Sequence, residues 1–286
     1  MKISLGVIPR NRMSKAENLE AVARAGDETG LTRIWLGDRL VYPVQYAHAG
    51  DLGDRFPWDV SDPQLEGVVA MTWLLASSRR IGVGVSVMVV PLRQPLVLAR
   101  QLASLDHLSG GRLTLGLGIG GVLEEYDCAM VDRHDRGARL DEYVEALKVL
   151  WTEERPSFDG RFVSFPELYC NPRPAQSGGI PLWFGGHLPP VWDRVVRAGA
   201  GLAAGSVTPE RAAQLRAELS HRCEAAGRDP ESVGLLVIAN NPDPDGLRRL
   251  LDGQRAAGVS EVVCPVRGRN PEEIAESVAF LAGFAE

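Results

Sequence analysis

The 286-residue sequence lacks several features that would assign it to a class at once. It has no run of about 18 apolar residues, so it lacks a segment able to span a membrane as a helix. It has no basic excess, since 31 Lys and Arg against 37 Asp and Glu give a net charge of −6, which argues against general nucleic-acid binding. The amino terminus lacks a long apolar segment and a small-residue cleavage site, so we expect no secretory signal and a cytoplasmic location.

Cysteine and histidine are few and widely spaced. The four cysteines form no CxxC pair, and the five histidines show neither HxxxH nor HExxH spacing. Since a structural zinc ion needs closely spaced ligands, we predict no metal site and interpret the cysteines as free thiols in a reducing compartment. The composition, with 45% hydrophobic and 24% charged residues, is typical of a folded globular protein and excludes intrinsic disorder.

Short apolar segments alternate with helical patterns along the whole chain. Strands are predicted at residues 2–8, 32–38, 81–90, 112–118, 180–186, 201–205, 233–239 and 259–266. Helices are predicted at 15–29, 62–78, 94–107, 136–152, 189–199, 209–226, 244–257 and 271–284. Gly30 is expected to end the first helix, and Asp62-Pro63 to begin the second, because glycine favours helix ends and proline the first helical position.

Eight strands that are apolar on both faces, each followed by a helix, indicate a parallel sheet. Eight such units in 286 residues predict an α/β fold, a single (β/α)8 TIM barrel over residues 1–286, with a doubly wound open sheet as the alternative.

Two insertions interrupt the alternation. The polar, aromatic segment at about 39–61 is expected to cover the site or simply to pack over the barrel mouth, and the segment at about 153–179 to hold a β-hairpin around Ser164.

Active sites of such barrels lie at the carboxyl ends of the strands, and three of these ends are rich in glycine. They are GLGIGG at 116–121, FGGH at 184–187 and GS at 205–206. Glycine lets a flat ring or a phosphate approach the backbone, although the same residues also suit tight turns. GLGIGG has the glycine spacing of a dinucleotide fingerprint at 116, 118 and 121 but lacks its acidic residue after a second strand, so a Rossmann site is poorly supported.

Several stretches together resemble a known family. RQPLVLARQLASLDHLSGGRLTLGLGIGG at 93–121, with RGARLDEYVEALKVLW, FDGRFVSF and IPLWFGG further on, is similar to the luciferase-like monooxygenases, most of all to the branch that uses the deazaflavin coenzyme F420. The resemblance covers nearly the whole chain. It implies a (β/α)8 barrel with an insertion, which agrees with the alternation of strands and helices.

The resemblance also implies roles for individual residues. It implies a non-prolyl cis peptide at Ser86-Val87 behind the deazaflavin ring, a glycine segment beside the ring after the fourth strand, a phosphate cradle after the fifth and sixth strands, and an acid at the end of the second strand that contacts the deazaflavin head. The cofactor-binding residues that it implies are Asp38, Ser86, Val87, Gly118, Ile119, Gly120, Gly185, Gly186 and Ser206.

Two positions depart from the sugar-phosphate dehydrogenases that the resemblance includes. Arg39 stands where those enzymes have a His, and Gly121 where they have a Glu, with Glu124 and Glu125 further on. Arginine cannot act as a general base because its pKa exceeds about 12, but it can bind an anion or stabilise developing negative charge. We predict Asp38 and Arg39 as the catalytic residues, with helix capping or loop ordering as the alternative role of Asp38, and the departures put sugar-phosphate oxidation in doubt.

Three functions follow from these residues. The favoured one is a coenzyme F420-dependent oxidoreductase that transfers a hydride between the deazaflavin and a small organic substrate. One alternative is an FMN-dependent monooxygenase using reduced flavin and oxygen, in which Arg136 or Arg139 would contact the flavin phosphate. The other is a cofactor-binding barrel without turnover, suggested by the missing His and Glu. No nucleic-acid or membrane partner is expected, and a homodimer is expected by analogy with the family.

Overall fold

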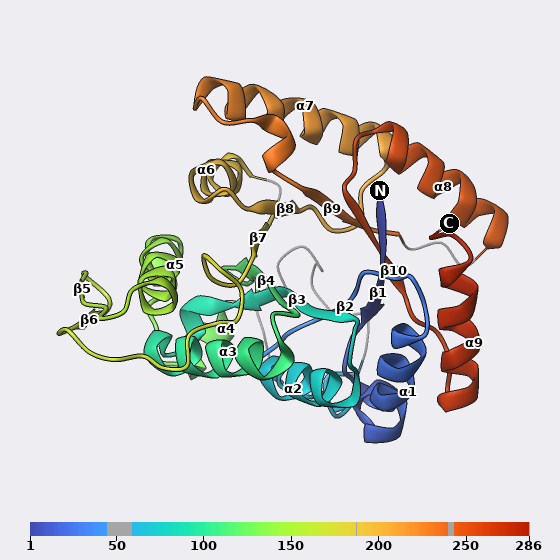
Figure 1. The fold of residues 1–286 in the computed structure, drawn as a ribbon, viewed down its shortest axis with the longest axis horizontal. Helices are drawn as coiled ribbons and strands as arrows, with labels where there is room; N and C mark the ends of the chain where they lie inside the picture. The colour runs from blue at the N-terminus through green and yellow to red at the C-terminus, as the bar shows by residue number, and fades with distance from the viewer. Residues whose placement is uncertain (45–58, 187, 240–242, 286) are drawn as a thin grey trace.

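The computed structural model describes residues 1–44, 59–186, 188–239 and 243–285. Eight parallel strands close into a barrel, and helices surround it (Figure 1). The strands are β1 (Lys2–Val7), β2 (Arg33–Leu36), β3 (Gly82–Val89), β4 (Leu113–Gly118), β7 (Leu182–Gly185), β8 (Gly201–Ala203), β9 (Leu235–Ile238) and β10 (Glu261–Pro265), and β1 pairs with both β2 and β10. The predicted (β/α)8 barrel is confirmed.

The helices follow the strands as the alternation predicts, with one short addition. They are α1 (Ala16–Asp27), α2 (Gly67–Ser77), α3 (Pro95–Ser109), α4 (Glu124–Cys128), α5 (Arg136–Thr152), α6 (Pro189–Ala198), α7 (Pro209–Ala225), α8 (Pro244–Ala256) and α9 (Pro271–Ala282). Short 3-10 turns include η1 (Asn11–Ser14), directly after β1. The added helix is α4, which was not predicted from the sequence. Within the described residues, no helix is both long and apolar enough to cross a membrane.

The second insertion contains the hairpin that the sequence predicts around Ser164. Its strands β5 (Phe158–Asp159) and β6 (Ser164–Phe165) are antiparallel, and the rings of Phe158 and Phe165 stack with centroids 6.0 Å apart. The Glu142 carboxylate of α5 accepts hydrogen bonds from the backbone amides of Phe162 and Val163 at 2.6 and 2.8 Å. These contacts fasten the hairpin to the outside of the barrel.

Two predicted helix boundaries are wrong. The helix predicted to begin at Asp62-Pro63 begins at Gly67, because the Asp62 carboxylate binds Arg10 and the Glu66 side chain caps the helix instead. Gly30 does not end α1. The helix stops at Asp27, and Glu28 is its C-cap in a right-handed conformation.

Large aromatic side chains fill the inside of the barrel. The rings of Trp35 and Trp183 meet edge to face with centroids 6.2 Å apart, and they pack with apolar side chains from β8, β9 and β10. Gly201 admits the Trp183 ring, which a Cβ at that position would overlap. Below Trp35, the buried Glu261 carboxylate accepts hydrogen bonds from Ser4 and Trp35 and binds Arg33. This packing closes the amino end of the barrel, so a ligand site has to lie at the carboxyl end.

Candidate functional site

The site is built around a bulge in β3. The pairing of β3 with β4 shifts between Val85 and Met88, and the Ser86-Val87 peptide within this shift is cis, as the resemblance implies. Methyl groups of Val87 lie 2.6 Å from where a Cβ would stand at Gly118 and at Gly185. Any side chain at either glycine would therefore collide with Val87. The glycines at the ends of β4 and β7 seat the bulge, and their predicted contact with a cofactor stays a prediction.

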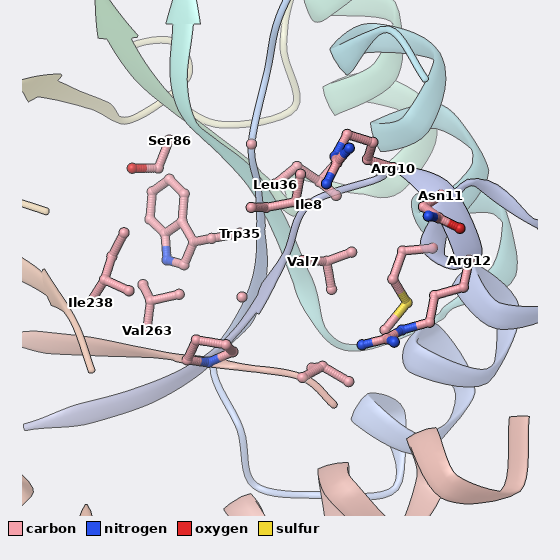
Figure 2. A pocket seen from close by; sticks show the side chains of 15 residues that line it. Val7, Ile8, Arg10, Asn11, Arg12, Trp35, Leu36, Ser86, Ile238 and Val263 are labelled. Carbon is pink, nitrogen blue, oxygen red and sulfur yellow. The ribbon is translucent and has the colours of Figure 1, made fainter. Parts of the chain in front are cut away.

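A cavity of about 530 Å³ opens beside the bulge at the carboxyl ends of the strands (Figure 2). Its walls come from the ends of β1, β2, β9 and β10, from η1, and from Ser86 of the bulge. Most of the lining side chains are apolar, and Figure 2 shows Trp35, Ile238 and Val263 grouped on the side of Ser86. A mostly apolar cavity with a few polar groups is the usual form of a small-molecule site.

The predicted site residues divide into one that faces this cavity and several that do not. Ser86 lines it. The other predicted residues, which are not among the described residues that line it, are Asp38, Arg39, Val87, Gly118, Ile119, Gly120, Gly185, Gly186 and Ser206. Several residues that the site predictions omitted, among them Trp35 and Arg12, do line it. Trp35 lies within the predicted strand 32–38 and Arg12 four residues after the predicted strand 2–8, so no strand-end signal marked either of them.

Asp38 is enclosed by protein donors. Its side chain has no exposed surface, and the carboxylate binds Arg93 at 2.9 Å. It also accepts hydrogen bonds from the amides of Gly67 at 3.2 Å and Val89 at 3.4 Å. Burial acts to lower the pKa of Arg93, but the Asp38 and Glu66 carboxylates beside it outweigh that effect and raise the pKa. Asp38 thus joins the end of β2, the end of β3 and the start of α2, and its predicted contact with a deazaflavin stays a prediction.

Arg39 forms a second buried ion pair, with Glu125 of α4. Its guanidinium donates to the Glu125 carboxylate at 2.6 Å, and the side chains are 17% and 1% exposed. The other Glu125 oxygen accepts hydrogen bonds from the amides of Leu40 at 3.0 Å and Val41 at 3.3 Å. Glu125 therefore holds both Arg39 and the first residues of the 39–61 insertion. The position of Glu125 in the sequence does not predict this role.

Much of the first insertion lies outside the described residues, which exclude 45–58. Where the segment is described, it is tied to its surroundings. The Tyr42 hydroxyl donates to the Gln64 side chain at 2.6 Å, and the Arg39 guanidinium lies over the Tyr42 ring at 5.7 Å. The expectation that this insertion covers the site stays a prediction.

The segment after β4 is fixed by a buried tyrosine. The Tyr126 hydroxyl donates to the carbonyl of Ile119 at 2.6 Å, and burial raises the pKa of this tyrosine, which keeps it a hydrogen-bond donor. Arg136 and Arg139 lie near Tyr126 and have local partners. Arg136 donates to the carbonyl of Arg133, and Arg139 donates to Tyr143. Their predicted contact with a flavin phosphate stays a prediction.

The ends of β7 and β8 carry the predicted phosphate cradle. Gly186 and Gly205 have positive φ angles of 135° and 68°, and a Cβ at Gly205 would meet no atom within 4 Å. Ser206 is exposed. Pro189 and Pro190 begin α6, so the first turn of this helix supplies fewer backbone N–H groups than an ordinary helix start. His187 and Asn240–Asn241, which follow strands at this end, lie outside the described residues.

Comparisons with known proteins agree with this architecture. The model of the family described as Luciferase-like monooxygenase matches residues 4–256. An uncharacterized protein of Mycobacterium tuberculosis is 31% identical over 269 residues, which cover 92% of each chain. An F420-dependent glucose-6-phosphate dehydrogenase of Kineococcus radiotolerans is 31% identical over 179 residues, covering 61% of this chain and 48% of the dehydrogenase.

A solved structure extends the agreement to the whole fold. The monooxygenase RslO1 from Streptomyces bottropensis is 21% identical to this chain, with a TM-score of 0.79 over 99% of this chain and 98% of its own. At this identity the likeness concerns the fold. The sequence match over residues 4–256 goes further, and the chain belongs to the luciferase-like monooxygenase family.

Proposed function

We propose that this protein is an oxidoreductase that uses coenzyme F420 and transfers a hydride between the deazaflavin and a small organic substrate. The observation that carries the proposal is the cavity of about 530 Å³ that opens beside the Ser86-Val87 bulge at the carboxyl end of the barrel. The relative from Kineococcus radiotolerans, an F420-dependent dehydrogenase by name, supports the choice of cofactor.

The residues beside the bulge fit a flat ring system. Trp35, Ile238 and Val263 give the cavity an apolar floor next to Ser86 (Figure 2). Across the barrel, a Cβ at Gly205 would meet no atom within 4 Å and Ser206 is exposed, so this strand end has room for a phosphate group of the cofactor. A bound deazaflavin would supply the hydride chemistry, since the cofactor carries the reaction and the protein orients it.

The residues of the chain supply position and charge. The ion pair with Glu125 offsets the charge of the Arg39 guanidinium and holds it in place at the end of β2, where its remaining N–H donors can orient a substrate. Asp38 and Arg93 hold the end of β3 and therefore the bulge. The packed barrel interior below the cavity excludes water from that side.

A substrate other than a sugar phosphate fits the departures from the dehydrogenase branch. Arg39 and Gly121 stand in place of the His and the Glu of those enzymes. Since arginine stays charged at neutral pH, Arg39 is proposed to orient the substrate and not to remove a proton.

The test is a paired titration of the purified protein with F420 and with FMN, followed by cofactor fluorescence. We expect micromolar binding of F420 and weaker binding of FMN. The opposite order would move the protein to the flavin-dependent alternative. Binding of neither cofactor would overturn the proposal and the predicted cofactor residues with it.

A matched pair of glycine variants locates the cofactor. Gly205 and Gly227 have φ angles of 68° and 67°, and a Cβ at either would meet no atom within 4 Å. Gly205→Leu and Gly227→Leu therefore impose similar backbone strain, but only Gly205 lies in the predicted cradle, while Gly227 follows α7 at the amino end of the barrel. We expect Gly205→Leu alone to weaken F420 binding. Equal binding by both variants would place the phosphate elsewhere.

A further inference from the structure

We infer that the substrate of the proposed reaction is an organic anion, an apolar body that ends in a carboxylate or phosphate group, and that Arg12, which follows β1, binds its charged group. The inference deepens the proposed function. Binding of the anion itself, however, requires no cofactor and can be measured without one.

The charge of the cavity wall is the first observation. Among the 15 described residues that line the cavity, two are arginines and none is Asp or Glu. The chain as a whole is acidic, with a net charge of −6. A cavity with low-dielectric walls and charge of one sign concentrates ions of the opposite sign. The absence of Asp and Glu from the described lining of this cavity, in a protein that is acidic as a whole, favours an anionic ligand there.

The two arginines differ in whether a carboxylate of the protein neutralises their charge. The Arg10 guanidinium binds the Asp62 carboxylate at 2.7 Å and donates to the carbonyl of Asp59 at 2.9 Å. These contacts fix its position and offset its charge. The Arg12 side chain is exposed, and among the described residues it forms no hydrogen bond and no ion pair. Arg12 is therefore the anion-binding group, and Arg10, whose guanidinium lies on another part of the cavity wall in Figure 2, adds positive charge to that wall.

The apolar part of the cavity wall indicates that the rest of the ligand is apolar and in which direction it extends. Figure 2 shows the Arg12 side chain reaching towards Val7, on the side of the cavity opposite Ser86 and Trp35. A ligand whose charged end binds Arg12 would extend along Val7 and Trp35 towards the bulge, where the proposed cofactor ring lies. The reacting carbon would then lie at the apolar end of the ligand, away from its charged group.

The phosphate of the cofactor does not account for these arginines. Around the barrel the order is β1, β10, β9, β8, β7, β4, β3, β2, so β1 lies opposite β7. The predicted phosphate cradle is at the ends of β7 and β8, and Arg10 and Arg12 follow β1. Two anionic groups can therefore bind at opposite sides of the mouth, with the bulge between them.

The test uses isothermal titration calorimetry of the protein without cofactor and three probes of equal chain length: octanoate, octyl phosphate and 1-octanol. We expect at least one of the two anions to bind about tenfold more tightly than octanol, the gain expected from one hydrogen bond to a charged group. Raising the salt concentration should reduce that preference, because Arg12 is exposed. Which anion binds more tightly identifies the charged group as carboxylate or phosphate.

The variants are Arg12→Gln and, as a control of equal charge change, Arg24→Gln. Arg24 is 72% exposed on α1 and does not line the cavity. We expect Arg12→Gln to remove the preference for the anions while octanol binding stays unchanged, and Arg24→Gln to retain it. Equal binding of octanol and both anions, or an undiminished preference in Arg12→Gln, would overturn the inference. Failure of F420 and FMN to bind would leave this result standing, so the two proposals fail separately.

Discussion

Two buried glutamates, one at each end of the barrel, each form an ion pair with an arginine, but they differ in their other hydrogen-bond partners. At the amino end, Glu261 of β10 binds Arg33 at 2.8 Å, and at the carboxyl end Glu125 of α4 binds Arg39 at 2.6 Å. Both glutamate side chains are 1% exposed. Their remaining partners differ. Glu261 accepts from the Ser4 and Trp35 side chains of two strands, and Glu125 accepts from two backbone amides of a loop.

This difference separates a group that stabilises the fold from a group that positions the site. The partners of Glu261 belong to strands β1 and β2, which the barrel holds in place whether or not the carboxylate is present. The partners of Glu125 belong to residues 39–41, which lead into the first insertion. Loss of Glu261 should therefore lower stability with little change in shape, and loss of Glu125 should release a loop.

The largest effect is expected from Glu261→Ala. The variant leaves the half-buried Arg33 charge and the Trp35 N–H without their acceptor inside the barrel. Breaking a buried ion pair by removing one partner costs about 3–5 kcal/mol. Urea unfolding followed by circular dichroism should show this loss in the free energy of unfolding.

The control for that loss is Glu272→Ala on α9, where the glutamate is exposed. We expect this variant to stay within about 0.5 kcal/mol of the parent protein. If Glu261→Ala matched it, the amino-end network would contribute nothing to stability, and the contrast between the two glutamates would be lost.

Glu125→Ala should cost less stability but change the site more. Breaking a buried ion pair by removing one partner costs about 3–5 kcal/mol, and part of that is recovered here because the freed loop can reach water. The freed loop should become open to trypsin after Arg39, and turnover should fall because the guanidinium loses its fixed position. Limited proteolysis with mass spectrometry of the fragments measures the first effect.

Asp127→Ala supplies the matched control, since Asp127 is an exposed residue of the same short helix. Cleavage after Arg39 should be unchanged in this variant and faster in Glu125→Ala. Equal cleavage in the two variants would show that Glu125 does not hold the loop, and it would then resemble Glu261 in role.

The barrel could be predicted from the sequence because its signal is local and repeated. Each strand is a short apolar run, and each is followed by a helical pattern, so the eight units could be recognised without knowledge of their contacts. The cis peptide at Ser86-Val87 came from the resemblance to the family, since no pattern of spacing marks such a bond.

The contacts that build the site could not be predicted, because they join residues far apart in the chain. Arg39 and Glu125 are separated by 86 positions, and Arg10 and Asp62 by 52. The second contact also explains the wrong start of α2, since Asp62 is used by Arg10 and not by the helix. For the glycines, the sequence showed that side chains were missing but not that Val87 fills the space at Gly118 and Gly185.

The smallest effect tests whether a carboxylate that holds a loop at the amino end behaves like Glu125. Asp27, at the end of α1, accepts hydrogen bonds from the amides of Arg80 at 2.9 Å and Ile81 at 2.8 Å. Burial acts to raise the pKa of Asp27, but backbone hydrogen bonds from Ile81, Arg80 and Arg79 outweigh it and hold the pKa below its ordinary value.

The lowered pKa of Asp27 stabilises the fold at pH values above the unfolded pKa of about 3.9, and this contribution is lost as the pH falls through the folded pKa. Asp27→Asn should therefore cost about 1 kcal/mol at pH 7, a small value because the site is partly open to solvent, and the difference should shrink below about pH 4. Urea unfolding of both proteins from pH 7 to pH 3 measures it, and a difference that stays constant over this range would show that the charge of Asp27 does not hold the loop.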